Sequence, residues 1–177
     1  MTFIGIISEN KSFDNIDEIL RKNLIEDTKL IHINKKSINN IKNIKCETII
    51  IDANLNEYIN ELCIIKKMCD KAKYIVINSD INTDYNIYNF KTNIITYGLN
   101  RKATITISSI SDGNILIYLQ RNLKSIDGKM IEIGEELVRV REEEKIKIYE
   151  ILMIYTIFLI KQKTITEQIQ EKSDFFK

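Results

Sequence analysis

The stretch that decides the fold is NIITYGLNRKATITISSI, residues 93–110, in which one kind of strand ends and another kind begins. Its first part, NIITYG, has the continuous apolar centre that is typical of a strand buried on both faces of a sheet. Its second part, ATITISSI, alternates apolar and polar residues, which is typical of a strand with one face in solvent. We therefore predict that a buried, parallel sheet changes here into an antiparallel extension.

Before this stretch, four short apolar runs alternate with segments of helical periodicity. The runs are TFIGII (residues 2–7), KLIHIN (29–34), ETIIID (47–52) and KYIVIN (73–78). Apolar residues recur at helical spacing over residues 12–24 and 56–72, and a short, weak helix is expected between the second and third runs. This alternation predicts βαβ crossovers and a mostly parallel sheet with helices on both faces.

After this stretch, the sequence predicts hairpins and a long helix. SDGN at residues 111–114 and a second Asp-Gly at Asp127 and Gly128 are strong hairpin signals. Residues 142–163 predict a helix whose centre, IYEILMIYTIFLI, is apolar nearly all round, so we expect it to be buried against the sheet or a partner. The predicted fold is a three-layer α/β/α sheet, P-loop or Rossmann-like, with an antiparallel β-hairpin extension. We expect a single domain over residues 1–177, with residues 170–177 as a flexible tail.

Composition argues against several functional classes. The 26 Lys and Arg balance 25 Asp and Glu, so no overall field favours nucleic acid, and the lysine-rich stretch KKSINNIKNIK at residues 35–45 is interpreted as a solvated helix face. The longest apolar run, residues 151–160, is too short to span a bilayer, and the start MTFIGIISEN has no signal-peptide pattern. We therefore expect a cytoplasmic protein without membrane insertion. Three cysteines without a Cys-x-x-Cys spacing predict reduced, mostly buried thiols.

The first strand leads into a degenerate phosphate-binding loop. Gly5 stands six positions before Lys11 and seven before Ser12, as in Gly-x-x-x-x-Gly-Lys-Ser, but Asn10 occupies the place of the second glycine. IGIISENKSF, TIIIDAN, VINSD and ITYGLN follow one another in the chain. In this order and at these separations they resemble elements of the central, ATP-binding domain of the Mur ligase family, which joins amino acids to a UDP-linked peptidoglycan precursor.

The resemblance implies a set of ligand-binding residues. Lys11 and Ser12 would hold phosphate, Asp52 would hold magnesium, and Asn78 and Asp80 would lie at the nucleotide. The alternatives are a solvated lysine beside an N-cap serine, a capping aspartate at position 52, and Asx turns at positions 78 and 80. His32, the only histidine, alternates with apolar residues along a strand and is interpreted as structural.

The departures from the family pattern point away from catalysis. The loop glycine at position 10 is lost, and Gly134 is followed by Glu135 and Glu136 where the family has Gly-x-His-Asn. No other catalytic constellation is present in the sequence. We therefore expect no catalytic residues, vestigial ligand-binding residues and no cofactor.

The resulting hypothesis is a non-catalytic Mur-ligase-like module for interaction or regulation. Its partner would be another protein or a second copy, contacted through the apolar last helix or Phe175 and Phe176. The alternative is a nucleotide-binding protein or a residual ATP-dependent ligase-like enzyme in bacterial cell-wall precursor metabolism, using ATP and magnesium. A nucleic-acid binder acting through residues 35–45 is the third and weakest option.

Overall fold

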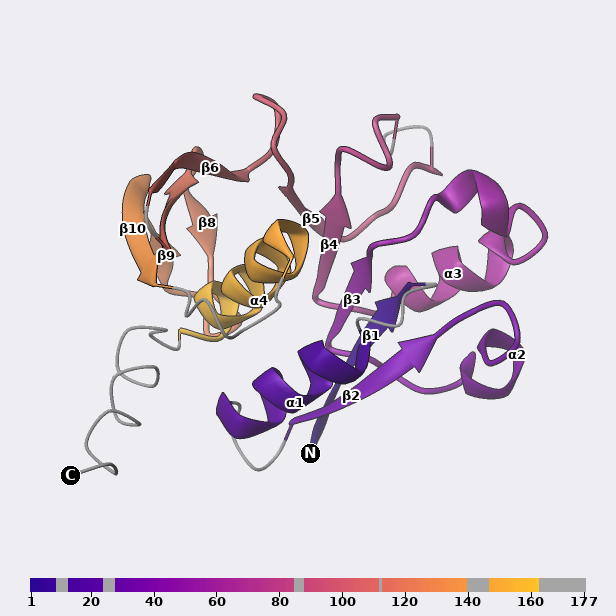
Figure 1. The fold of residues 1–177 in the computed structure, drawn as a ribbon. Helices are drawn as coiled ribbons and strands as arrows, with labels where there is room; N and C mark the ends of the chain where they lie inside the picture. Colours follow the sequence, from indigo (N-terminus) through magenta and orange to yellow (C-terminus); the bar gives the residue numbers. More distant parts are fainter. Residues whose placement is uncertain (9–12, 24–27, 85–87, 112, 140–146, 163–177) are drawn as a thin grey trace. The chain divides into compact units, whose positions relative to one another are not determined.

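A computed structural model describes residues 1–8, 13–23, 28–84, 88–111, 113–139 and 147–162 (Figure 1). Its contacts divide the chain into two compact units, Met1–Thr96 and Tyr97–Lys177. Hydrogen bonds link eight strands in the order β10-β7-β6-β5-β4-β3-β1-β2, and a separate pair is formed by β8 and β9. The mostly parallel sheet with an antiparallel extension confirms the predicted α/β fold. The single domain over residues 1–177 stays a prediction, and the predicted tail at 170–177 lies outside the described residues.

The first unit is built from parallel strands and short helices. Its elements are β1 (Thr2–Ile7), α1 (Phe13–Asn23), β2 (Thr28–Ile33), α2 (Ile38–Ile41), β3 (Thr48–Ile51), the 3₁₀ helix η1 (Leu55–Tyr58), α3 (Leu62–Cys69), β4 (Tyr74–Asn78) and β5 (Asn93–Tyr97), whose last residue is the first of the second unit. Strand β1 lies between β2 and β3, and β3 pairs in turn with β4, all in parallel. Every residue of β3 and β4 is buried, which explains why these strands are continuous apolar runs.

One helix that the sequence predicts in this unit is interrupted in the structure. The periodic stretch 56–72 forms η1 and α3 with a turn between them. The side chain of Asn54 accepts a hydrogen bond from the Asn56 amide and starts the tight turn of η1. Leu55 and Tyr58 of η1 are fully buried, whereas Ile59 in the turn that follows is 68% exposed. Helical spacing alone does not reveal such a break, because both pieces keep apolar residues at similar intervals.

The second unit combines an antiparallel sheet with one helix. Its elements are β6 (Ile105–Ser111), β7 (Asn114–Leu119), β8 (Leu123–Lys124), β9 (Met130–Ile131), β10 (Gly134–Arg139) and α4 (Ile148–Lys161). Both predicted hairpins are confirmed, joining β6 to β7 and β8 to β9. Gly113 at φ 74° and Gly128 at φ 83° supply the left-handed backbone that these turns require. The sequence analysis missed β10, whose only two apolar side chains, Leu137 and Val138, are adjacent and therefore show no alternation.

The long helix is shorter than predicted at its start. Lys147 has an extended backbone, and its amide donates to Glu150 Oε2 at 3.1 Å, so the helix begins at Ile148 instead of Glu142. The three glutamates at 142–144 lie outside the described residues. Glu150 provides the acidic residue in the first turn of α4.

The turn after β5 is held by hydrogen bonds rather than by left-handed residues. Gly and Asn are the residues that adopt a positive φ most readily, but neither Gly98 nor Asn100 is among the described residues that do so. The Gly98 amide donates to the Ile105 carbonyl at 3.1 Å, and Asn100 Oδ1 accepts from the Lys102 amide at 2.9 Å. The second bond is an Asx turn, which asparagine makes at low cost.

The cysteines allow a direct test of the packing. Cys46 and Cys69 are buried and Cys63 is exposed. Burial raises the pKa of the Cys46 thiol to about 11, and burial with the nearby Asp70 raises that of Cys69 further. At pH 8 in the folded protein, we therefore expect a chromogenic disulfide reagent to titrate Cys63 alone, and to titrate all three thiols after unfolding. Reaction of a second thiol at the rate of the first would contradict this packing.

Candidate functional site

The predicted site residues Asp52, Asn78 and Asp80 come together at the carboxyl ends of β3 and β4. Asp52 follows the last residue of β3, and Asn78 is the last residue of β4. Asn78 Nδ2 donates to Asp52 Oδ1 at 2.8 Å, and Asn78 Oδ1 accepts from the Asp80 amide at 3.1 Å. Parallel strands end at one edge of their sheet, which is why residues 26 positions apart meet.

The two hydrogen bonds of Asn78 agree on the orientation of its amide. The backbone amide of Asp80 is a donor only, so it must face the Asn78 oxygen. The Asn78 nitrogen then faces the Asp52 carboxylate, which accepts. Asn78 is completely buried, and its side chain is thus committed at both ends to neighbours within this unit.

Asn82 supports this cluster and was missed by the sequence analysis. It is only 5% exposed, and its Oδ1 accepts from the Leu55 amide at 3.0 Å. Its Nδ2 donates to the Ala53 carbonyl at 3.0 Å, and its own amide donates to the Asn78 carbonyl at 3.0 Å. One side chain therefore ties the loop after β3 to the loop after β4. The only signal in the sequence is a polar residue four positions after the strand end.

The described residues offer limited support for a metal centre. They contain no group of three or more His, Cys, Asp or Glu side chains arranged to hold a metal ion. Magnesium is usually held in proteins by one or two carboxylates together with water and phosphate oxygens. Asp52 as a metal ligand, and Asn78 and Asp80 as nucleotide ligands, stay predictions.

The degenerate phosphate loop is described only at its start. Lys11 and Ser12 lie outside the described residues, whereas Ser8 is buried and its amide donates to the Ile33 carbonyl at 3.3 Å. Gly5 is an interior residue of β1, paired with Ile31 on one side and Ile49 on the other. A Cβ at Gly5 would lie 2.7 Å from Ile33 Cδ1, so this glycine serves packing within the sheet.

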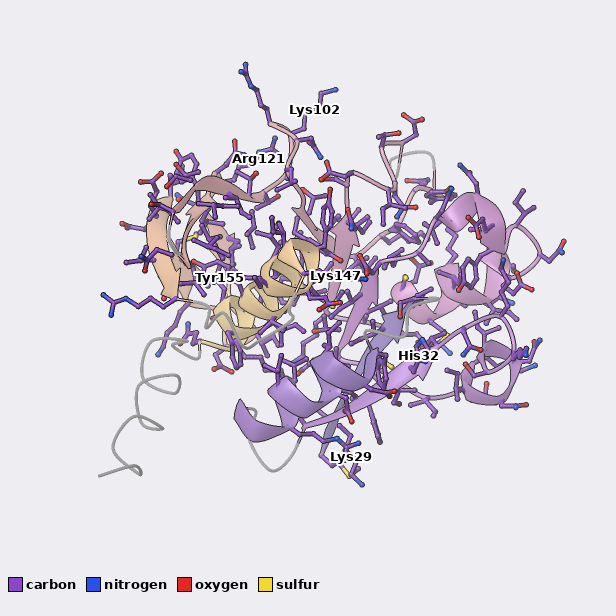
Figure 2. All side chains as sticks on the ribbon, viewed as in Figure 1. Lys29, His32, Lys102, Arg121, Lys147 and Tyr155 are labelled. Atoms are coloured by element: carbon purple, nitrogen blue, oxygen red, sulfur yellow. The ribbon has the colours of Figure 1, made fainter. Side chains whose placement is uncertain are left out.

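His32 has structural partners, as expected. Its Nε2 lies 2.8 Å from the Ser8 carbonyl oxygen and therefore carries the proton and donates. The Ser8 hydroxyl lies 3.2 Å from the same nitrogen, and the imidazole stacks on Phe13 with ring centroids 4.6 Å apart. The histidine thus joins β2, where Figure 2 labels it, to the end of β1 and the start of α1.

The last helix is buried, as the sequence analysis expects, and a partner bound through it stays a prediction. Ten residues of α4 are buried, including both Met153 and Phe158. Tyr155, labelled in Figure 2, donates to Glu136 Oε2 of β10 at 3.0 Å, and burial together with this carboxylate raises the pKa of the Tyr155 hydroxyl. Phe175 and Phe176 lie outside the described residues.

These observations define an α/β protein whose polar loops gather at the carboxyl edge of a mostly parallel sheet. No protein-family model and no curated protein matches the chain. Among solved structures it is similar to the MurF ligase from Thermotoga maritima in complex with ADP, with a TM-score of 0.55 and 9% sequence identity. The match covers 92% of this chain and 46% of the ligase, so the chain spans about half the length of that enzyme. At this identity the similarity shows a Mur-ligase-like fold. Within the described residues, no helix has the length and apolarity needed to cross a membrane.

Proposed function

We propose that the chain is a cytoplasmic module with a Mur-ligase-like fold that performs no ligation and acts by binding another protein or a second copy. The hydrogen bonds from Asn78 to Asp52 and from Asp80 to Asn78 carry the proposal. At the position where the family resemblance implies nucleotide and magnesium, these polar groups stabilise the protein's own loops.

The free-energy cost of withdrawing these side chains from their protein partners to bind a ligand supports the non-catalytic proposal. Asn78 is fully buried, so withdrawing its amide from either neighbour leaves a buried polar atom without a partner, at roughly 1–3 kcal/mol. Asn10 adds a side chain where the phosphate loop needs close backbone approach. Both features favour a scaffold over a nucleotide site, and we expect no cofactor.

A nucleotide titration tests the proposal. A ligand that binds only the folded state adds about 2.7 kcal/mol of stability at a hundredfold excess over its Kd, which raises Tm by roughly 5–10 °C for a chain of this size. We expect millimolar ATP with magnesium, or a UDP-sugar with magnesium, to move Tm by less than about 1 °C. A rise of several degrees that EDTA reverses would overturn the non-catalytic proposal.

Nucleotide binding is the second candidate, with ATP and magnesium as ligands and a residual ligase-like activity as its extension. The meeting of Asp52, Asn78 and Asp80 at one sheet edge favours it, as does the ADP in the similar MurF structure. Under this candidate, Asp52→Asn abolishes the magnesium-dependent rise in Tm. Asn40→Ala, at an exposed site on α2, leaves that rise intact. A rise that survives Asp52→Asn contradicts the assigned metal ligand.

A further inference from the structure

Strand β10 is a regular edge strand of the second unit (orange in Figure 1). Its six residues pair continuously with β7, from Gly134 opposite Leu119 to Arg139 opposite Asn114, without a bulge. In the described part of the chain, β7 is the strand to which β10 is hydrogen-bonded. The backbone groups on its other side are therefore placed to pair with a further strand.

The side chains of β10 divide cleanly between its two faces. Val138 is 5% exposed and Glu136 accepts the Tyr155 hydrogen bond, so these residues face the core of the unit. Glu135, Leu137 and Arg139 alternate with them and are exposed, with Leu137 at 44%. The outer face of the edge strand thus reads acid, leucine, base.

This outer face is complementary to itself. If two copies of β10 run antiparallel with Leu137 on the two-fold axis, Leu137 lies opposite its symmetry mate. Glu135 then lies opposite Arg139 of the second copy, and the symmetry repeats this pair. Directly opposed residues have Cβ atoms about 4.5–5.5 Å apart, which allows both ion pairs to form. On the other face, Glu136 lies opposite Val138.

Strand β10 lacks the features that usually prevent an edge strand from pairing with another strand. Edge strands are commonly protected from pairing by a proline, a β-bulge or charges of one sign. Strand β10 contains neither a proline nor a bulge. Its charges have opposite signs on either side of Leu137, so they favour pairing in this one register. By contrast β2, the edge strand of the first unit, carries the exposed Lys29 (Figure 2) and no acid, so two copies paired there gain no ion pair.

We propose that a second copy of this chain binds through β10, by an antiparallel, two-fold symmetric pairing centred on Leu137. The pairing joins the antiparallel sheets of two copies across an isologous interface. This inference rests on the proposed function, because it names the partner of the interaction module. Six paired residues bury less area than the interfaces of stable complexes, so the dimer is expected to be weak and dependent on concentration.

Charge reversal tests the register. Sedimentation velocity from about 10 μM to about 1 mM should show a monomer–dimer equilibrium. Glu135→Arg and Arg139→Glu each turn two attractive pairs into two like-charge pairs, so each should weaken dimerisation about tenfold or more. The double variant restores both pairs with their signs exchanged and should restore the dimer. Glu132→Arg, an exposed reversal outside β10, changes the net charge by the same amount as Glu135→Arg and should leave the dimer unchanged.

Cysteine crosslinking gives a second, geometric test. In a Cys63→Ser background, Leu137→Cys places two thiols opposite each other on the axis and should yield a disulfide-linked dimer under mild oxidation. Glu135→Cys is the matched control, because its two copies are four residues apart along the strand, roughly 13 Å, and should not crosslink. Equal crosslinking by both variants overturns the register.

The outcomes also separate this inference from the proposed function. A protein that is monomeric at every concentration overturns self-pairing, whether or not some other strand occupies the edge. If the nucleotide titration is then negative, the non-catalytic proposal stands without this partner. A magnesium-dependent rise in Tm together with an intact, charge-sensitive dimer overturns the proposed function and supports the pairing.

Discussion

Replacing Gly5 by valine is expected to lower the free energy of unfolding by about 3 kcal/mol. A Cβ at this position would lie 2.7 Å from Ile33 Cδ1, 3.0 Å from Ile49 Cδ1 and 3.1 Å from Cys46 Sγ. Favourable contacts between carbon atoms begin near 3.5 Å, and all three neighbours are buried. None of them can move into solvent to relieve the overlap, so β1 must shift between its two partner strands.

Denaturant unfolding measures this effect, and Gly134→Val is its matched control. At Gly134 an added Cβ would meet nothing within 4 Å, although the residue also lies in a strand. Valine is favoured over glycine in strands, so the control should stay within about 0.5 kcal/mol of the parent or gain stability. Equal losses in the two variants would show that strand position, and not crowding at β1, determines the cost.

Replacing Asn82 by alanine is expected to cost about 2–4 kcal/mol of stability. Asn82 is 5% exposed, and its side chain provides the hydrogen bonds to the Leu55 amide and the Ala53 carbonyl. Without it, two buried backbone groups lose a partner, and the loops after β3 and β4 lose their direct side-chain link.

Thermal or denaturant unfolding again provides the measurement, with Asn40→Ala as the matched control. Asn40 is exposed on α2, where alanine is the better helix former, so its replacement should be neutral or slightly stabilising. A loss below about 0.5 kcal/mol for Asn82→Ala would contradict its assigned role, because water would then satisfy both backbone groups equally well.

Much of the fold was predictable because the apolar composition of its strands indicates that they are buried on both faces. The runs that became β1, β3 and β4 are apolar at nearly every position, and only a sheet covered on both faces buries them. The hairpin glycines were equally predictable, since Gly113 and Gly128 adopt a backbone that other residues rarely reach. Such local signals do not depend on which segments later become neighbours.

The candidate site was only half predictable. Asp52, Asn78 and Asp80 stand at predicted strand ends, so their meeting followed from parallel pairing. Asn82 gave no such signal, because its partners are backbone groups more than 25 positions earlier in the chain. Strand β10 was missed because its two apolar residues, Leu137 and Val138, are adjacent and do not alternate with its charged residues, so only its pairing with β7 identifies it as a strand.

The sequence by itself determined the parallel sheet, the two hairpins and the residues that gather at the strand ends, because these depend on periodicity and on the φ preferences of glycine. Only the tertiary structure decided how those residues are used. It commits the Asn78 amide to Asp52 and Asp80, and it leaves Leu137 exposed between charges of opposite sign on β10. The physical reason is that burial and hydrogen-bond partners are properties of contacts between segments distant in the chain, which local patterns do not encode.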